Sequence, residues 1–373
     1  MPNDPNSATP YLLQTLANRS ALIRLAVIGV AVLIVVTCFA FVGGWFSSHL
    51  TPALMVDGLE GANGMWPGFR RNHAKGVCIT GHFDSNGQGM RLSKAAVFRP
   101  GQAPVIGRLS LSGGHPYAAD GPASVPGTVR SMALAFRPTD GEEWRVAMLD
   151  IPVFIVRDPG SFYQLLVASR PDPATGKPDA AKIQDFVAHH PETARALEVV
   201  RASSFSSGFA NASYNSLNAF RFQNTTGTWT PVRWSMVAID AFEPEPTTQS
   251  AAKDKNYLFD AVIARIKQAP AQWSLVVTIG EPGDPTSDAT TPWPGNRERI
   301  DVGMLTIEHI EGEATGNCRD LNFDPLVLPA GIEPSDDPLL SARSAAYSIS
   351  FSRRAGEPKE PSAVRVPDGR KGG

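Results

Sequence analysis

The segment Phe69–Gly76, FRRNHAKG, places a histidine directly after two arginines and one asparagine. It runs into the apolar stretch Val77–Phe83, VCITGHF, whose composition is typical of a strand. An imidazole changes its charge near neutral pH, so His73 could carry a proton in a reaction. The same pattern also describes a surface histidine at a strand edge, and this segment alone does not separate the two interpretations.

A second pair of residues that could do chemistry lies in the predicted helix Pro338–Phe351. Arg343 and Tyr347 are four residues apart, and such positions lie one above the other on a helix. A guanidinium beside a phenol favours the phenolate, because the opposite charge stabilises the ionised form. A phenolate is a hard anionic ligand for ferric iron, and tyrosine is one of the recurring axial ligands of haem. Taken alone, the spacing also fits an ordinary surface pair.

Several segments resemble the catalase superfamily, in the same order along the chain. FRRNHAKG resembles the segment with the distal histidine, and the last helix resembles the proximal helix with its tyrosine. Between them, Gly107–Gly114 resembles a strand of the family in which an arginine and a serine face the haem. Ile151–Pro159 resembles the family's Pro-x-Phe-x-x-Arg-Asp segment. The resemblance covers roughly residues 50–354. The chain is identified as a member of the superfamily, similar to its small, membrane-anchored, catalase-related haem peroxidases.

The resemblance implies haem b, with its iron, as the cofactor and a role for individual residues. His73 would take a proton from peroxide and return it to the leaving oxygen, while Ser110 would hydrogen-bond the other ring nitrogen. Tyr347 would be the axial iron ligand, kept ionised by Arg343. Three arginines would bind the two haem propionates and one phenylalanine would contact the porphyrin: Arg70, Arg108, Arg354 and Phe154.

Two positions depart from the family pattern. Where catalases have a distal asparagine that orients peroxide, the aligned residue is Leu149, and Asp150 would point to the opposite face of the strand. Asn72 replaces the usual apolar residue before the histidine and makes the entrance more polar. The loss of a donor at position 149 favours a peroxidase, which reduces hydrogen peroxide or organic hydroperoxides and oxidises small organic donors, with weak catalase activity.

Other functions remain open at this point. The chain could be a true catalase, or could rearrange fatty-acid hydroperoxides like the allene oxide synthase relatives. It could also be a non-catalytic, haem-binding scaffold on a membrane complex. The joint presence of His73, Ser110, Arg343 and Tyr347 favours an enzyme, because a scaffold needs no proton carrier.

These residues must be positioned by a strand-rich body. Alternating apolar residues predict antiparallel strands at 131–136, 220–222, 232–236 and 304–310, with a hairpin turn at Asn224–Gly227. Helices are predicted over 180–200, with a restart at Pro191, and over 256–267. The resemblance implies an α+β fold with a closed antiparallel β-barrel of catalase type, surrounding helices and one preceding transmembrane helix.

The N-terminus predicts a membrane anchor. Leu25–Phe46 carries no charge over 22 residues, which is long enough as a helix to cross about 30 Å of hydrocarbon. We expect an uncleaved signal anchor at 25–47, because the apolar stretch exceeds that of a cleavable signal peptide. Arg19 and Arg24 precede it, so residues 1–24 would be cytoplasmic and the body periplasmic, in a single-pass protein of the bacterial inner membrane. We further predict a haem domain at 48–354 and a disordered tail at 355–373.

Composition limits the partners. A net charge of −2 gives no reason to expect a nucleic-acid partner. The three cysteines are too few for a disulfide framework; Cys78 and Cys318 could pair, but buried free thiols are expected. The resemblance ends after the proximal helix, so no NADPH is expected. The expected partners are peroxide, a small-molecule or lipid reductant, the membrane and, in a homodimer, a second copy.

Overall fold

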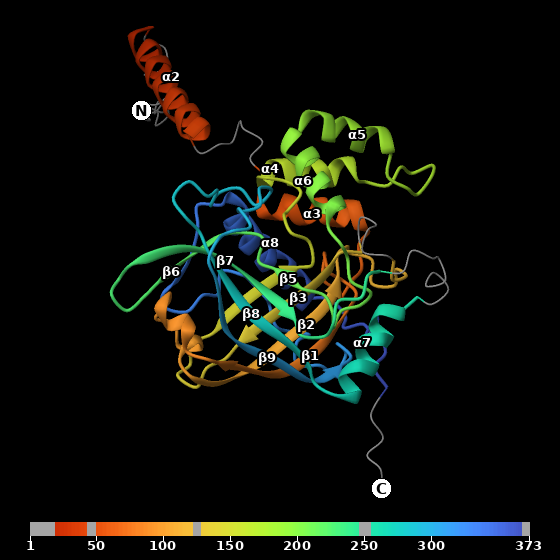
Figure 1. Ribbon diagram of the computed structural model, residues 1–373. Coiled ribbons are helices and arrows are strands. Elements are labelled where there is room, and N and C mark those ends of the chain that lie inside the picture. Colours follow the sequence, from red (N-terminus) through yellow and green to blue (C-terminus); the bar gives the residue numbers. More distant parts are fainter. Residues whose placement is uncertain (1–18, 43–49, 122–127, 246–254, 368–373) are drawn as a thin grey trace, which may run out of the picture. The chain divides into compact units, whose positions relative to one another are not determined.

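The computed structural model describes residues 19–42, 50–121, 128–245 and 255–367 (Figure 1). The chain divides into two units, Met1–Thr51 and Pro52–Gly373. Within the first, helix α2 (Arg19–Val42) contains an apolar span, Ala21–Phe41, with a mean hydropathy of 2.7. A helix of this length and composition is either a membrane span or a signal sequence. The last residues of the predicted anchor lie outside the described residues.

In the described part of the second unit, eight strands close into an antiparallel barrel. Their order is β7-β5-β4-β3-β2-β1-β9-β8, and β8 pairs back with β7. Two short strands, β6 (Phe220–Gln223) and β10 (Ile332–Pro334), extend from β7. The barrel strands are β1 (Gly76–Ser85), β2 (Gly101–Leu111), β3 (Arg130–Phe136), β4 (Trp144–Leu149), β5 (Tyr214–Asn215), β7 (Trp229–Ala238), β8 (Ala271–Ile279) and β9 (Arg299–Glu311). The predicted fold class is therefore confirmed.

Strand alternation separates a packed core from a wall that carries polar side chains. In β4, Trp144, Val146 and Met148 are buried in the core, and Trp144 stacks on Phe136 with ring centroids 5.1 Å apart. The alternate residues face the other way, because successive side chains of a strand point to opposite faces. Strand register then aligns two rows across β2, β3 and β4: Ser110–Ser131–Leu149 and Arg108–Ala133–Ala147.

The helices predicted over 180–200, 256–267 and 338–351 are present, and α3 and α4 are additional helices that were not predicted. Figure 1 shows α3, α4, α5 and α6 gathered on one side of the barrel, and α3 packs against both α4 and α8. Pro191 begins α6 directly after α5, and the last helix, α8, runs a turn beyond its predicted end. The bounds are α3 (Pro52–Asn63), α4 (Pro159–Ala168), α5 (Ala180–His189), α6 (Pro191–Ala202), α7 (Tyr257–Gln268) and α8 (Pro338–Ala355), with 3₁₀ turns η1 (Gln88–Arg91) and η2 (Ala96–Phe98).

The predicted disordered tail is wrong for residues 355–367. Val364 is 1% exposed and belongs to the main core, and Glu357 forms an ion pair with Arg71. The Ser362 hydroxyl accepts a hydrogen bond from the Ala314 N–H at 2.6 Å. These partners lie far away in the sequence, so the polar, proline-rich composition gave no sign of them. Residues 368–373 lie outside the described residues.

The expectation of buried free thiols is also wrong. Cys78 of β1 and Cys318, in the loop after β9, form a disulfide with a Cα–Cα distance of 5.3 Å. Both residues are fully buried, whereas Cys38 is free and exposed. The two partners are 240 residues apart in sequence, and only the pairing of β1 with β9 brings that loop next to Cys78.

Candidate active site

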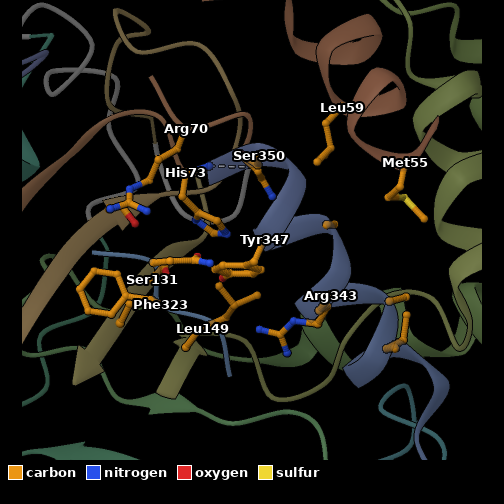
Figure 2. Close-up of a pocket in the computed structure, with 18 of the residues that line it drawn as sticks. Met55, Leu59, Arg70, His73, Ser131, Leu149, Phe323, Arg343, Tyr347 and Ser350 are labelled. Atoms are coloured by element: carbon orange, nitrogen blue, oxygen red, sulfur yellow. Dashed lines mark hydrogen bonds between the residues drawn. The ribbon is translucent and has the colours of Figure 1, made fainter. Parts of the chain in front are cut away.

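One cavity of about 180 Å³ collects the residues that the sequence singled out. It is lined by the polar rows of β2, β3 and β4, by α8, by α3 and by the segments 70–73, 154–162 and 216–218. Figure 2 shows His73 and Tyr347 reaching into it from the segment before β1 and from α8. Every predicted site residue lies on its wall: Arg70, His73, Arg108, Ser110, Phe154, Arg343, Tyr347 and Arg354.

The main chain holds His73 in an uncommon conformation. Its φ is +56°, in the left-handed region, which costs roughly 1–2 kcal/mol for a residue with a Cβ. Local hydrogen bonds offset this cost. The His73 N–H donates to Asn72 Oδ1 at 3.0 Å, and the Ala74 N–H donates to the Gly113 carbonyl at 3.0 Å. Lys75 Nζ then anchors the segment to Asp120 Oδ1 at 2.6 Å.

The His73 imidazole is neutral at physiological pH. Burial lowers its pKa to about 3, and the positive charges of Arg108, Arg343 and Arg70 act in the same direction. Its Nδ1 atom is buried and has no hydrogen-bond partner among the described residues. The expected hydrogen bond from Ser110 is therefore absent, although both side chains line the cavity. Sequence order placed the two residues on one wall but did not determine the distance between their side chains.

Three arginines meet beside a single carboxylate at one edge of the cavity. Arg108 donates from Nε and Nη2 to the two oxygens of Glu313, at 2.7 and 2.9 Å. Arg70 Nη2 donates to the carbonyls of Cys318 and Leu321, both at 3.0 Å, and Arg354 donates to the carbonyl of residue 319. The loop after β9 thus holds all three guanidinium groups. The sequence analysis missed Glu313, because one glutamate in a loop carries no distinguishing pattern.

This cluster carries an excess of positive charge. Burial, together with the charges of Arg108 and Arg354, lowers the pKa of Arg70 to about 9. Burial would raise the pKa of Glu313, but the charge of Arg108 and its hydrogen bonds keep it below its usual value. Three guanidinium groups face one carboxylate, and the buried Arg70 Nε, 3.8 Å from Glu313 Oε1, makes no hydrogen bond within the described part of the chain. Such a cluster suits a ligand with two more carboxylates.

The cavity walls fit the rest of a haem group. The cavity is lined largely by apolar side chains, including Leu149, Phe154 and Leu339, which suit a flat apolar macrocycle. Tyr347 presents a phenol oxygen, which suits ferric iron. Because the arginine cluster complements two propionates, the described residues fit haem in charge, polarity and donor type.

Arg343 is held by a chain of hydrogen bonds at the start of α8. Its Nη1 donates to Asn218 Oδ1, and Asn218 Nδ2 donates to Asp337 Oδ2 at 2.8 Å. Asp337 in turn caps α8 by accepting from the Leu339 N–H at 2.9 Å. No hydrogen bond joins Arg343 to Tyr347 in the described structure, so the role of Arg343 in ionising Tyr347 stays a prediction. Asn218 is a further site residue that no sequence pattern indicated.

The cavity wall is apolar at position 149. Leu149 lines the cavity, whereas Asp150 points away from it and accepts from the Arg130 N–H at 2.8 Å. Burial raises the pKa of Asp150 to about 7, against the opposing charge of Arg130. Asp150 therefore cannot replace the missing donor inside the cavity.

Apolar helices complete the cavity on the side of α3. Figure 2 shows Met55 and Leu59 projecting from α3, and Phe162 of α4 packs 5.9 Å from Phe154, measured between ring centroids. The sequence analysis did not predict these residues. The four-residue spacing of Met55 and Leu59 would have placed both on one helix face.

Comparisons with known proteins agree with this geometry. The family model described as Catalase matches residues 68–365. A catalase-related peroxidase of Synechococcus elongatus is 36% identical over 311 residues, which cover 83% of this chain and 91% of that protein. A catalase-related peroxidase of Mycolicibacterium paratuberculosis is 32% identical over 311 residues, covering 83% and 96%.

Solved catalases share the fold at lower identity. A fungal catalase superposes with a TM-score of 0.69 at 19% identity, covering 81% of this chain and 64% of that one. Catalase A from Saccharomyces cerevisiae superposes with a TM-score of 0.68 at 20% identity, covering 77% and 61%. The chain thus spans somewhat over half of each of these larger proteins.

Proposed function

Because this chain belongs to the catalase family, whose members are oxidoreductases that act on peroxide, we propose that it is a haem peroxidase with weak catalase activity. It would reduce hydrogen peroxide or organic hydroperoxides and oxidise small organic donors. The observation that carries the proposal is the meeting of a neutral, buried His73 and Tyr347 in one cavity beside an arginine cluster with too few counter-ions.

The residues that would hold haem b come from four parts of the fold. Tyr347 of α8 would supply a phenol oxygen to the iron. Arg70, Arg108 and Arg354 would neutralise the two propionates, and Phe154 would pack against the porphyrin. When bound, haem supplies the iron centre at which peroxide is reduced and which passes the oxidising equivalents to a donor.

His73 would move the proton during cleavage of the peroxide O–O bond. A base must be unprotonated before it can act, and the lowered pKa keeps the imidazole in that form. We assign the transfer to Nε2, because Nδ1 is buried. The ring would accept a proton from one peroxide oxygen and return it to the leaving oxygen, so that water or an alcohol departs.

Leu149 favours a peroxidase over a true catalase. Dismutation needs a second hydrogen peroxide to be aligned as the reductant, and the Leu149 side chain offers it no hydrogen bond from β4. A small organic donor does not need that alignment. The apolar side chains of Met55, Leu59 and Phe162 also suit an organic hydroperoxide or a lipid reductant.

We also propose that α2 is a single-pass anchor in the bacterial inner membrane, with the enzyme body in the periplasm. The buried Cys78–Cys318 disulfide supports this location, because structural disulfides persist in oxidising compartments. Arg24 precedes the apolar stretch, as the positive-inside rule requires. Protease digestion of intact spheroplasts should remove the body; full protection would refute this orientation.

The first test uses the purified full-length protein loaded with haem. We expect the high-spin ferric spectrum of tyrosinate ligation, and peroxide-dependent oxidation of a phenolic donor that exceeds oxygen evolution. Tyr347→Phe should lose haem or shift the spectrum, whereas Tyr163→Phe, on α4, is a matched control outside the cavity wall. A fully folded wild-type protein that takes up no haem would refute the proposal. Oxygen evolution as the dominant reaction would instead establish a true catalase.

A further inference from the structure

Asn72 has an amide whose orientation is determined by the main chain. Its Oδ1 atom accepts hydrogen bonds from the His73 N–H at 3.0 Å and from the Gly113 N–H at 2.8 Å. An amide nitrogen cannot accept either bond, so the oxygen must occupy this position and Nδ2 must take the other. Both N–H donors belong to the main chain, so their positions are fixed and only the oxygen end of the amide can face them.

The donor end of this amide has no partner. Among the described residues, Asn72 Nδ2 makes no hydrogen bond, and Asn72 lies on the wall of the cavity. Three of the guanidinium groups around it are already held: Arg108 by Glu313, Arg343 by Asn218, and Arg70 by backbone carbonyls. An N–H group that faces a cavity without a protein partner is available to a bound ligand.

The same hydrogen bond that orients the amide also ties it to His73. Asn72 Oδ1 binds the main-chain N–H of the histidine, so the amide and the imidazole share one rigid support. The histidine that it holds has a left-handed main-chain conformation, at φ +56°. A peroxide that gives a proton to His73 would therefore lie within the region that the Asn72 side chain lines.

From this geometry we propose that Asn72 Nδ2 donates a hydrogen bond to the bound peroxide and orients it beside His73. The inference rests on the proposed function. It gives the chain an uncharged distal donor from the segment before β1, on a cavity where Leu149 of β4 supplies none. The donor serves hydrogen peroxide and organic hydroperoxides alike, because both have a peroxide oxygen that can accept the bond.

Two variants separate hydrogen-bond donation from support of the backbone. Asn72→Asp keeps an oxygen for the His73 and Gly113 N–H groups but removes the N–H donor. It should retain the melting temperature and the haem spectrum, while kcat/KM for hydrogen peroxide falls about tenfold or more, as expected for one lost hydrogen bond to a charged or polarised group. Asn72→Val removes the donor without adding charge, but it also removes the oxygen that accepts from the His73 and Gly113 N–H groups.

A binding measurement avoids dependence on turnover. Fluoride binds ferric haem and accepts hydrogen bonds, so its dissociation constant, measured by optical titration of the haem-loaded full chain, reports a distal donor. We expect Asn72→Val to raise this constant about tenfold. Adding Leu149→Asn to that variant supplies an amide from the other wall and should recover part of the affinity.

The outcomes are distinct. Wild-type fluoride affinity in Asn72→Val, or wild-type kcat/KM in Asn72→Asp, would overturn the inference and leave the proposed function standing. Both variants could instead lose kcat/KM or fluoride affinity together with a fall in melting temperature, without recovery from Leu149→Asn. That result would show that Asn72 only supports the backbone, and it would also overturn the inference. A wild-type chain that binds no haem would refute the proposed function and this inference together.

Discussion

Removal of the Cys78–Cys318 disulfide should destabilise the body and weaken haem retention. Both sulfurs are fully buried, so a reductant would not reach them in the folded protein, and substitution is the cleaner perturbation. The double variant Cys78→Ala/Cys318→Ala removes the bond without leaving a buried thiol. The loop that contains Cys318 also supplies carbonyl partners to Arg70 and Arg354, so its loosening should disturb the arginine cluster.

The size of the effect follows from the loop that the disulfide closes. The two cysteines are 240 residues apart, for which the chain-entropy model gives about 5.5 kcal/mol at 25 °C. Measured costs of removing a native disulfide are about 2–5 kcal/mol, because the unfolded chain retains some structure. At roughly 2 °C per kcal/mol for a body of this size, the melting temperature should fall by roughly 4–10 °C.

Thermal melts of the haem-loaded full chain in detergent, at one scan rate, provide the assay, with haem loss followed at the Soret band. Cys38→Ala is the matched control, because Cys38 is exposed and unpaired. An unchanged melting temperature in the double variant would refute the entropic argument. An unchanged rate of haem loss, despite a lower melting temperature, would refute the link between the disulfide and the arginine cluster.

Four further predictions concern the cavity and the arginine cluster at its edge. His73→Ala should keep haem but slow peroxide cleavage by about 10²–10⁴-fold in stopped-flow traces; near-normal rates would remove the proton-transfer role. The pKa of His73, about 3, implies a peroxide rate constant without a histidine titration between pH 5 and 8. The histidine binds a proton near pH 6.5 in the unfolded chain but only near pH 3 in the folded one. The stability that His73 contributes is therefore complete above pH 6.5 and falls as the pH drops towards 3. In urea unfolding, His73→Gln should lose less stability than wild type between pH 6.5 and 3. Glu313→Gln removes the carboxylate that the buried Arg108 binds and should cost about 3–5 kcal/mol in urea unfolding of the haem-free protein, and an unchanged midpoint would contradict the charge argument.

Local sequence patterns determined most of the elements and part of the site. Pro191 divides α5 from α6, and the Asp337–Pro338 pair begins α8, because capping and proline geometry act within a few residues. Arg108 and Ser110 share a strand face through the two-residue repeat, and Arg343 and Tyr347 share a helix face. The resemblance of these short segments to the catalase superfamily then supplied the family.

Only the tertiary structure decided which groups meet across long separations. The disulfide, Glu313 at the arginine cluster and Asn218 at Arg343 depend on loops brought together by barrel closure, and no local periodicity records such contacts. The packing of residues 355–367 depends in the same way on distant partners. The Asn72 amide is the clearest case: its sequence position indicates a polar residue, but two backbone N–H groups, one of them 41 residues away, determine which end of the amide faces the cavity.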